Sequence, residues 1–178
     1  MNRVRRNLRW ALLFGGALAT VAAAQSKPRE IKPVEGIIPS GFGESVDRDV
    51  ARAREATVAF KSTDRALKSG YLAADNCVAH PQHGAMGYHF RRDALYDAKL
   101  EVDKPEILVY EKMADGSFKL NGVEYIVPID AWKRDEAPTI MGQKLKRAEN
   151  LGIWYLHVWI WEPSPSGVFA DWNPRVKC

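Results

Sequence analysis

The sequence predicts an α+β fold, a single domain in which an amphipathic helical region packs on a curved antiparallel sheet. Two observations support this prediction. Between residues 46 and 67 apolar residues recur at three- or four-residue spacing, whereas after Cys77 they alternate in short segments bounded by glycines, prolines and Asp-Gly. A helix followed by a run of strands is typical of the α+β class, and the chain is long enough to bury one sizeable core.

Residues 1–24 have the pattern of a secretory signal peptide. Four arginines precede an apolar run at 10–21, and Ala22-Ala23-Ala24 supplies small residues for cleavage before Gln25. Arg5-Arg6 also resembles a twin-arginine signal, although its flanking residues match that signal poorly. We expect an exported protein, periplasmic or secreted. After cleavage it should have no stable membrane anchor, because no later run is long and apolar enough to cross a bilayer.

The charge balance gives no reason to expect nucleic acid as a partner. The chain has 26 Lys+Arg and 22 Asp+Glu, and four of the arginines lie in the predicted signal, so the rest of the chain is close to neutral. The basic isoelectric point is therefore a property of the signal and gives no support for nucleic-acid binding.

Residues 25–45 carry three prolines and three glycines, which predicts an extended lead-in to a domain at 46–178. Ser45 stands where a helix N-cap is expected, and the helix should break near Ser62-Thr63 and end at Gly70. Its apolar stripe is expected at Val46, Val50, Ala53, Thr57, Phe60 and Leu67.

Five strands are expected after Cys77, at 85–91, 106–112, 117–120, 123–127 and 153–161. Ala114-Asp115-Gly116 should form a hairpin turn, and Asn121-Gly122 indicates either a bulge or a second tight turn. The polar stretch 128–150 is expected to be a long connection with about one helical turn.

Cys77 and Cys178 are the two cysteines of the chain. An even pair in an oxidising compartment is most simply a disulfide. The alternative is ligation of a metal by thiolate, which His80 and His83 nearby would support.

The predicted strand at 153–161 is apolar on both faces. One parity places Tyr155, Trp159 and Trp161 on the same face as His157, and a strand without a polar face lies inside the protein or lines a cavity. We therefore expect the aromatic residues Tyr155, Trp159 and Trp161 to form a pocket beside His157.

Two further titratable residues lie in apolar strands. His89 follows the small residues Ala85 and Gly87, and Glu124 stands between β-branched and aromatic neighbours, where a carboxylate is unusual unless it is paired or metal-bound. His89, Glu124 and His157 together would suit a mononuclear divalent metal such as Zn, Fe or Cu. The alternatives are ordinary structural roles for all three residues, or a metal-free site in which His157 is the general base.

His80 and His83 raise a second metal possibility, with His83 as an extra ligand. Pro81 prevents the two imidazoles from sharing a helical face, which favours a solvated loop instead. The chain has no Gly-x-Ser-x-Gly, His-Glu-x-x-His, Walker or Gly-x-Gly-x-x-Gly motif.

Several blocks of the chain resemble those of a group of uncharacterised bacterial exported proteins. The blocks are GAMGYHF at 84–90, PEILVYE at 105–111, GVEYIVP at 122–128, YLHVWIW at 155–161 and FADWNPRVKC at 169–178. The resemblance implies an exported location and no activity.

Taken together, the signal peptide and the candidate site predict an exported protein that binds a small molecule or a metal. The alternative is a structural or protein-interaction module of the cell envelope, without catalysis.

Overall fold

The computed structural model of the protein describes residues 39–73 and 76–178. The predicted signal peptide 1–24 and most of the lead-in 25–45 lie outside the described residues. Within the described part the elements in chain order are α1 (Glu44–Thr57), η1 (Val58–Lys61), α2 (Thr63–Lys68), β1 (Cys77–His80), β2 (Gly84–Arg91), η2 (Asp93–Leu95), β3 (Ile107–Lys112), β4 (Phe118–Pro128), β5 (Thr139–Ile140), β6 (Gln143–Lys144), β7 (Lys146–Ala148), η3 (Glu149–Leu151) and β8 (Ile153–Val158).

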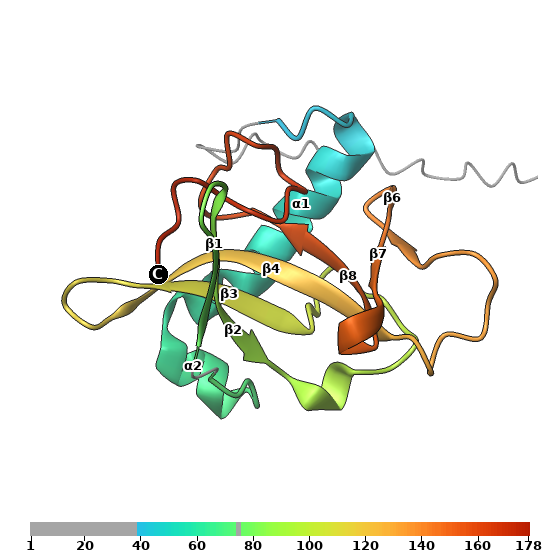
Figure 1. Ribbon diagram of the computed structural model, residues 1–178, viewed down its shortest axis with the longest axis horizontal. Helices are drawn as coiled ribbons and strands as arrows, with labels where there is room; N and C mark the ends of the chain where they lie inside the picture. The colour runs from blue at the N-terminus through green and yellow to red at the C-terminus, as the bar shows by residue number, and fades with distance from the viewer. Residues whose placement is uncertain (1–38, 74–75) are drawn as a thin grey trace, which may run out of the picture. The chain divides into compact units, whose positions relative to one another are not determined.

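Six of the strands form one antiparallel sheet in the order β1-β2-β3-β4-β8-β7 (Figure 1). β5 and β6 form a separate two-stranded hairpin. The predicted α+β class is confirmed. The sheet curls, and α1 lies across one of its faces.

Helix α1 presents a stripe of buried residues to the sheet. Val46, Val50, Ala53 and Thr57 follow the spacing of one helical face and are buried against the largest apolar cluster of the sheet. The helical region changes to a 3-10 turn at Val58 and resumes as α2 at Thr63, which agrees with the predicted break.

Two details of the helical prediction are wrong. The helix begins at Glu44 with Gly43 as its N-cap, so Ser45 lies inside the first turn and makes no capping bond. In α2 the buried residue is Ala66, while Leu67 is 47% exposed. α2 is only six residues long, and Ala66 is its one buried residue.

Strand β4 runs continuously from Phe118 to Pro128, where two strands were expected. The Asn121-Gly122 signal is a β-bulge: Val109 pairs with Gly122 and Tyr110 with Leu120, so Asn121 has no partner in β3. The hairpin turn around Ala114-Asp115-Gly116 joins β3 to β4 as predicted.

The stretch 128–150 is more ordered than predicted. It contains the β5–β6 hairpin and then β7, which pairs with β8 and forms one edge of the sheet. These strands are only two or three residues long, too short for alternation of apolar and polar residues to reveal them. β1 was also missed, because its four residues end at a His-Pro pair that indicates a loop.

The predicted last strand extends too far. β8 ends at Val158, and the chain then leaves the sheet. The carbonyl oxygen of Asn121, the bulged residue of β4, accepts hydrogen bonds from the backbone N–H groups of Trp161 and Glu162, both at 2.9 Å. The face parity of the strand therefore does not extend to Trp161.

Candidate metal centre

His89, Glu124 and His157 lie on three different strands and share one face of the sheet. Glu124 in β4 is the direct cross-strand partner of His157 in β8. His89 in β2 pairs with Val109 in β3, and Val109 pairs with Gly122, which is on the same side of β4 as Glu124. This face is opposite to α1, because the helix packs against the residues of the other parity.

The three side chains converge on one point. The Nε2 atoms of His89 and His157 are 3.3 Å apart, and the Nε2 atom of His89 lies 3.5 Å from one carboxylate oxygen of Glu124. The Nε2 atom of His157 lies 3.8 Å from the other carboxylate oxygen. Each residue therefore offers one ligand atom to a common position, and the group could hold a metal ion. The structure brings together all three residues that the sequence nominated.

The cluster is buried, with one accessible side. The His157 side chain is 0% exposed, Glu124 is 7% exposed and His89 is 16% exposed. Solvent therefore reaches the cluster past His89. Glu124 lies in a central strand and is buried, so it is not a surface carboxylate.

Burial sets the protonation of the cluster. It raises the pKa of Glu124 to about 8, lowers the pKa of His89 to about 4 and holds the pKa of His157 well below its usual range. Without a cation, the group at neutral pH therefore consists of a protonated carboxyl and two neutral imidazoles. Neutral imidazoles are the form that binds metal, and a divalent cation would replace the carboxyl proton.

Tyr96 and Asp171 are neighbours of the cluster that sequence reasoning missed. Tyr96 packs against the apolar residues on the sheet face that carries the three ligands. Burial raises the pKa of Tyr96, and the charge of Glu124 raises it further. Asp171 raises the pKa of Glu124 further, and it forms a salt bridge of 2.5 Å with Lys146 of β7. Asp171 stands between apolar and aromatic residues in the sequence, as Glu124 does, and this pattern could have identified it.

The three predicted pocket aromatics do not form one surface. Tyr155 and Trp159 belong to the cluster on the His157 side, and the Trp159 ring centroid is 5.3 Å from that of His157. Trp161 packs instead in the cluster on the helix side. Its Nε1 donates to the hydroxyl of Thr57 in α1, and Arg54 and Lys61 lie over its ring.

His80 and His83 remain outside the cluster. Their rings stack on each other with centroids 4.3 Å apart, and His80 also contacts Trp172. Among the described residues no third ligand joins them. The prediction that His83 could be an extra ligand of the His89 site therefore has no support in the geometry.

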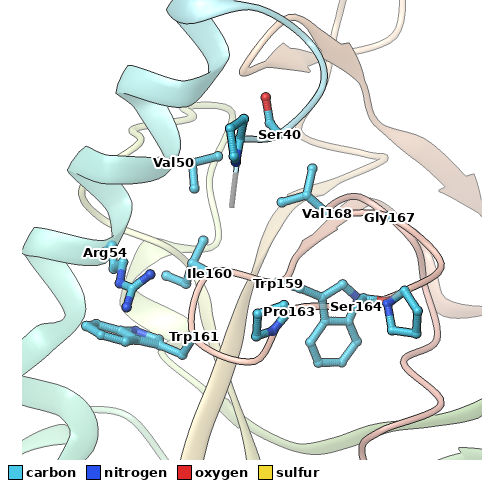
Figure 2. Close-up of a pocket in the computed structure, with 12 residues that line it drawn as sticks. Ser40, Val50, Arg54, Trp159, Ile160, Trp161, Pro163, Ser164, Gly167 and Val168 are labelled. Carbon is cyan, nitrogen blue, oxygen red and sulfur yellow. The ribbon is translucent and has the colours of Figure 1, made fainter. Parts of the chain in front are cut away.

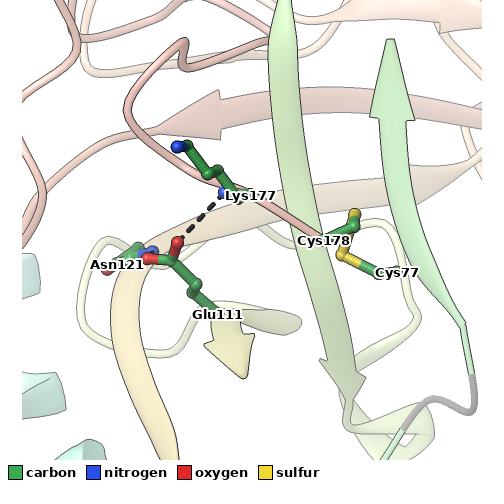
Figure 3. Close-up of a disulfide and its surroundings, with 5 residues drawn as sticks. All are labelled: Cys77, Glu111, Asn121, Lys177 and Cys178. Carbon is green, nitrogen blue, oxygen red and sulfur yellow. Dashed lines mark hydrogen bonds between the residues drawn. A yellow bond between two sulfur atoms is a disulfide. The ribbon is translucent and has the colours of Figure 1, made fainter. Parts of the chain in front are cut away.

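Cys77 and Cys178 form a disulfide, as predicted, with their Cα atoms 5.6 Å apart (Figure 3). A thiolate metal site at Cys77 is thereby excluded. The C-terminal segment is held at further points: the backbone N–H of Lys177 donates to Glu111, Asn173 forms a β-bridge with Ala85, and Val176 is buried in the same apolar cluster as Val109.

The disulfide is compatible with an exported protein. In the part of the chain that the structure describes, none of the helices has the length and apolar character needed to cross a bilayer. Comparison of the chain with protein families, with curated proteins and with solved structures gave no match in any of the three.

Proposed function

We propose that the protein is an exported metal-binding protein that holds one zinc ion between His89, Glu124 and His157. One observation carries the proposal: two imidazoles and a carboxylate from three strands meet in a buried position. The two Nε2 atoms are 3.3 Å apart, and they lie 3.5 Å and 3.8 Å from the two different oxygens of Glu124. Ligands about 2.0–2.1 Å from a tetrahedral zinc ion lie about 3.3–3.5 Å apart. Ligands of an octahedral ion at the same bond length lie about 2.9 Å apart, so the separations of 3.3 and 3.5 Å favour zinc over iron.

A site with three protein ligands leaves a fourth position for water or a small ligand. The partly exposed His89 marks the side from which such a ligand would enter. A zinc-bound water there would be acidified and could act as a nucleophile, which is the class of chemistry that two histidines and a glutamate support.

Export is the second part of the proposal. The arginine-rich start, the apolar run and Ala22-Ala23-Ala24 support a cleaved signal, and the disulfide supports an oxidising compartment.

The test is metal analysis of the untagged protein purified from the exported fraction. Intact mass should correspond to a chain that begins at Gln25. We expect one zinc per chain, and EDTA-treated protein should regain one equivalent of Zn²⁺ in competition with a chelating dye. Glu124→Gln and His89→Gln should each weaken zinc affinity by about 100-fold or more, because losing even an outer hydrogen-bond partner of a ligand costs about 10- to 100-fold.

His83→Gln is the matched control, because it also removes an imidazole, at an exposed turn. Thermal melts establish that each variant is folded. Equal zinc affinity in folded Glu124→Gln and in His83→Gln would contradict the proposal. Stoichiometric iron or copper in place of zinc would keep the site and overturn the choice of ion.

A metal-free site is the second candidate, and the contact between the two Nε2 atoms at 3.3 Å favours it as a hydrogen bond between neutral imidazoles. In that case no metal binds after reconstitution with Zn²⁺, Cu²⁺ or anaerobic Fe²⁺.

The packing of Trp161 on α1 favours the alternative of a structural or interaction module. For such a module, substitution of His89, Glu124 or His157 would change neither metal binding nor ligand binding.

A further inference from the structure

A cavity of about 250 Å³ lies between α1 and the segment that follows β8 (Figure 2). It is separate from the metal cluster, although Trp159 contributes to both: this residue lines the cavity, and its ring contacts His157. Further apolar lining comes from three prolines, from Val50 of α1 and from Ile160, Trp161 and Val168. A space of this size fits a small organic molecule with an apolar body.

Most polar groups around the cavity are already paired within the protein. The indole N–H of Trp161 donates to Thr57, and the indole N–H of Trp159 donates to the carbonyl oxygen of Ala170 at 2.7 Å. The hydroxyl of Ser40 donates to Asp47, and that of Ser164 accepts from Ser166. None of these groups therefore offers a charged partner to a ligand, and among them the Ser164 hydroxyl keeps a proton to donate.

Arg54 is the exception. It projects from α1 toward Trp161, with its guanidinium carbon 4.5 Å from the centre of the indole ring, and it has no ion pair with any described residue (Figure 2). Stacking on an indole uses the flat face of a guanidinium and leaves N–H groups on its edge, which suit the two oxygens of a carboxylate. Lys61, whose ammonium lies 4.0 Å from the centre of the same ring, adds positive charge nearby.

We propose that this cavity binds a small monocarboxylate with an aromatic or other apolar body, held by Arg54 through its carboxylate and by Trp159 and Trp161 through its body. The apolar part of the lining favours a ligand with an apolar body, and the Arg54 guanidinium, which lines the cavity itself, favours a carboxylate on that ligand. This inference does not depend on a metal in the His89 site.

The experiment uses phenylacetate as the probe and phenylacetamide as its neutral isostere. Binding to the exported protein is followed by the indole N–H signals of Trp159 and Trp161 in ¹⁵N-labelled protein, assigned with Trp161→Phe. We expect saturable shifts of these signals with phenylacetate and at least about tenfold weaker binding of phenylacetamide, because a hydrogen bond to a charged group contributes more than one to a neutral group.

Arg54→Gln should weaken phenylacetate binding by about tenfold or more and leave phenylacetamide binding unchanged. Arg48→Gln is the matched control, because Arg48 also lies on α1 but pairs with Glu44 at the surface. Glu124→Gln should leave phenylacetate binding intact, which separates this result from that of the metal experiment.

Three results would overturn the proposal. One is the absence of saturable shifts with phenylacetate in the wild-type protein, and another is equal binding of the acid and the amide. The third is unchanged phenylacetate binding in folded Arg54→Gln, which would mean that Arg54 acts only on the C-terminal end of the helix dipole. The comparison of acid with amide needs no variant, so it stands even if Arg54→Gln does not fold.

Discussion

Glu106 is a second buried carboxyl group, outside the metal cluster. It directly precedes β3, is 2% exposed, and one of its oxygens accepts a hydrogen bond of 3.0 Å from the backbone N–H of Ile126 in β4. Burial raises the pKa of Glu106 to about 8, and the hydrogen bond from Ile126 opposes that shift only in part. The native protein therefore keeps this carboxyl protonated at neutral pH, whereas an unfolded chain ionises it.

Glu106→Gln should change the pH dependence of stability. Between pH 4.5 and 8 the native state holds a proton that the unfolded chain loses, so this group makes stability fall as the pH rises through that window. The fall is at most about 5 kcal/mol. Glutamine has no proton to lose and can still accept from Ile126.

The measurement is urea unfolding of metal-free wild-type and variant protein at pH 5 and pH 9. The difference between the two proteins should shift in favour of the variant at pH 9. The lowered pKa of His89 acts in the opposite direction below pH 6.5, and it cancels in this comparison because both proteins contain it. A difference that is the same at both pH values would contradict the assignment.

At the scale of strands, β2, β3, β4 and β8 position the metal cluster, and the bulge of β4 determines their register. The sequence indicated each ligand separately, since a titratable residue inside an apolar strand is unusual. The sequence could not show that the three ligands meet. Their convergence depends on which strands pair and on the position of the bulge at Asn121. A shift of one residue would turn Glu124 to the helix side of the sheet.

The same limit explains the aromatic residues. Parity predicted Tyr155 and His157 on one face correctly, because both lie within β8. Parity failed for Trp161, because the chain leaves the sheet after Val158 and the backbone N–H of Trp161 donates to the carbonyl oxygen of Asn121. That hydrogen bond joins residues far apart in the sequence. Local patterns carry no information on such contacts, whereas the helical stripe and the hairpin turn are local and were predicted.

Gly87→Ala should disrupt β2 at its crossing with β3. Gly87 has φ +109°, and a Cβ atom there would lie 2.3 Å from the carbonyl oxygen of Tyr110. Gly116→Ala is the matched control, because Gly116 has φ +83° and open space around it. We expect a loss of about 1–2 kcal/mol from backbone strain at Gly116 and about 2 kcal/mol more at Gly87.

Urea unfolding of both variants measures these losses. Zinc affinity should also fall in Gly87→Ala, since His89 is two residues further along the same face, and should stay unchanged in Gly116→Ala. Equal unfolding free energies for the two variants would show that β2 can move away from Tyr110 without cost.

At the scale of the whole molecule, the disulfide joins the first strand of the sheet to the C-terminal segment. The two cysteines are 101 residues apart, and Val176 beside Cys178 is buried on the sheet face that carries the metal cluster. The cross-link therefore restricts the unfolded chain strongly and also holds the C-terminal segment over that face.

The double substitution Cys77→Ser and Cys178→Ser should lower the free energy of unfolding by up to about 4–5 kcal/mol, the loss expected for a closed loop of this length. Urea unfolding provides the measurement. Wild-type protein reduced with a phosphine should match the double variant, because both lose the same cross-link. No loss in either would mean that the packing of Val176 and Asn173 already holds the C-terminal segment.

The position of the two cysteines has a consequence for cleavage of the chain. The eight strands of the described part of the chain lie within the span that they close, and so do His89, Glu124 and His157. Residues 133–136 form an exposed stretch within that span and include a lysine and an arginine. A trypsin cut there leaves two fragments that remain covalently joined. Nicked protein should therefore migrate as one species on a non-reducing gel and separate into two after reduction, so cleavage in the protein's own compartment need not release either part.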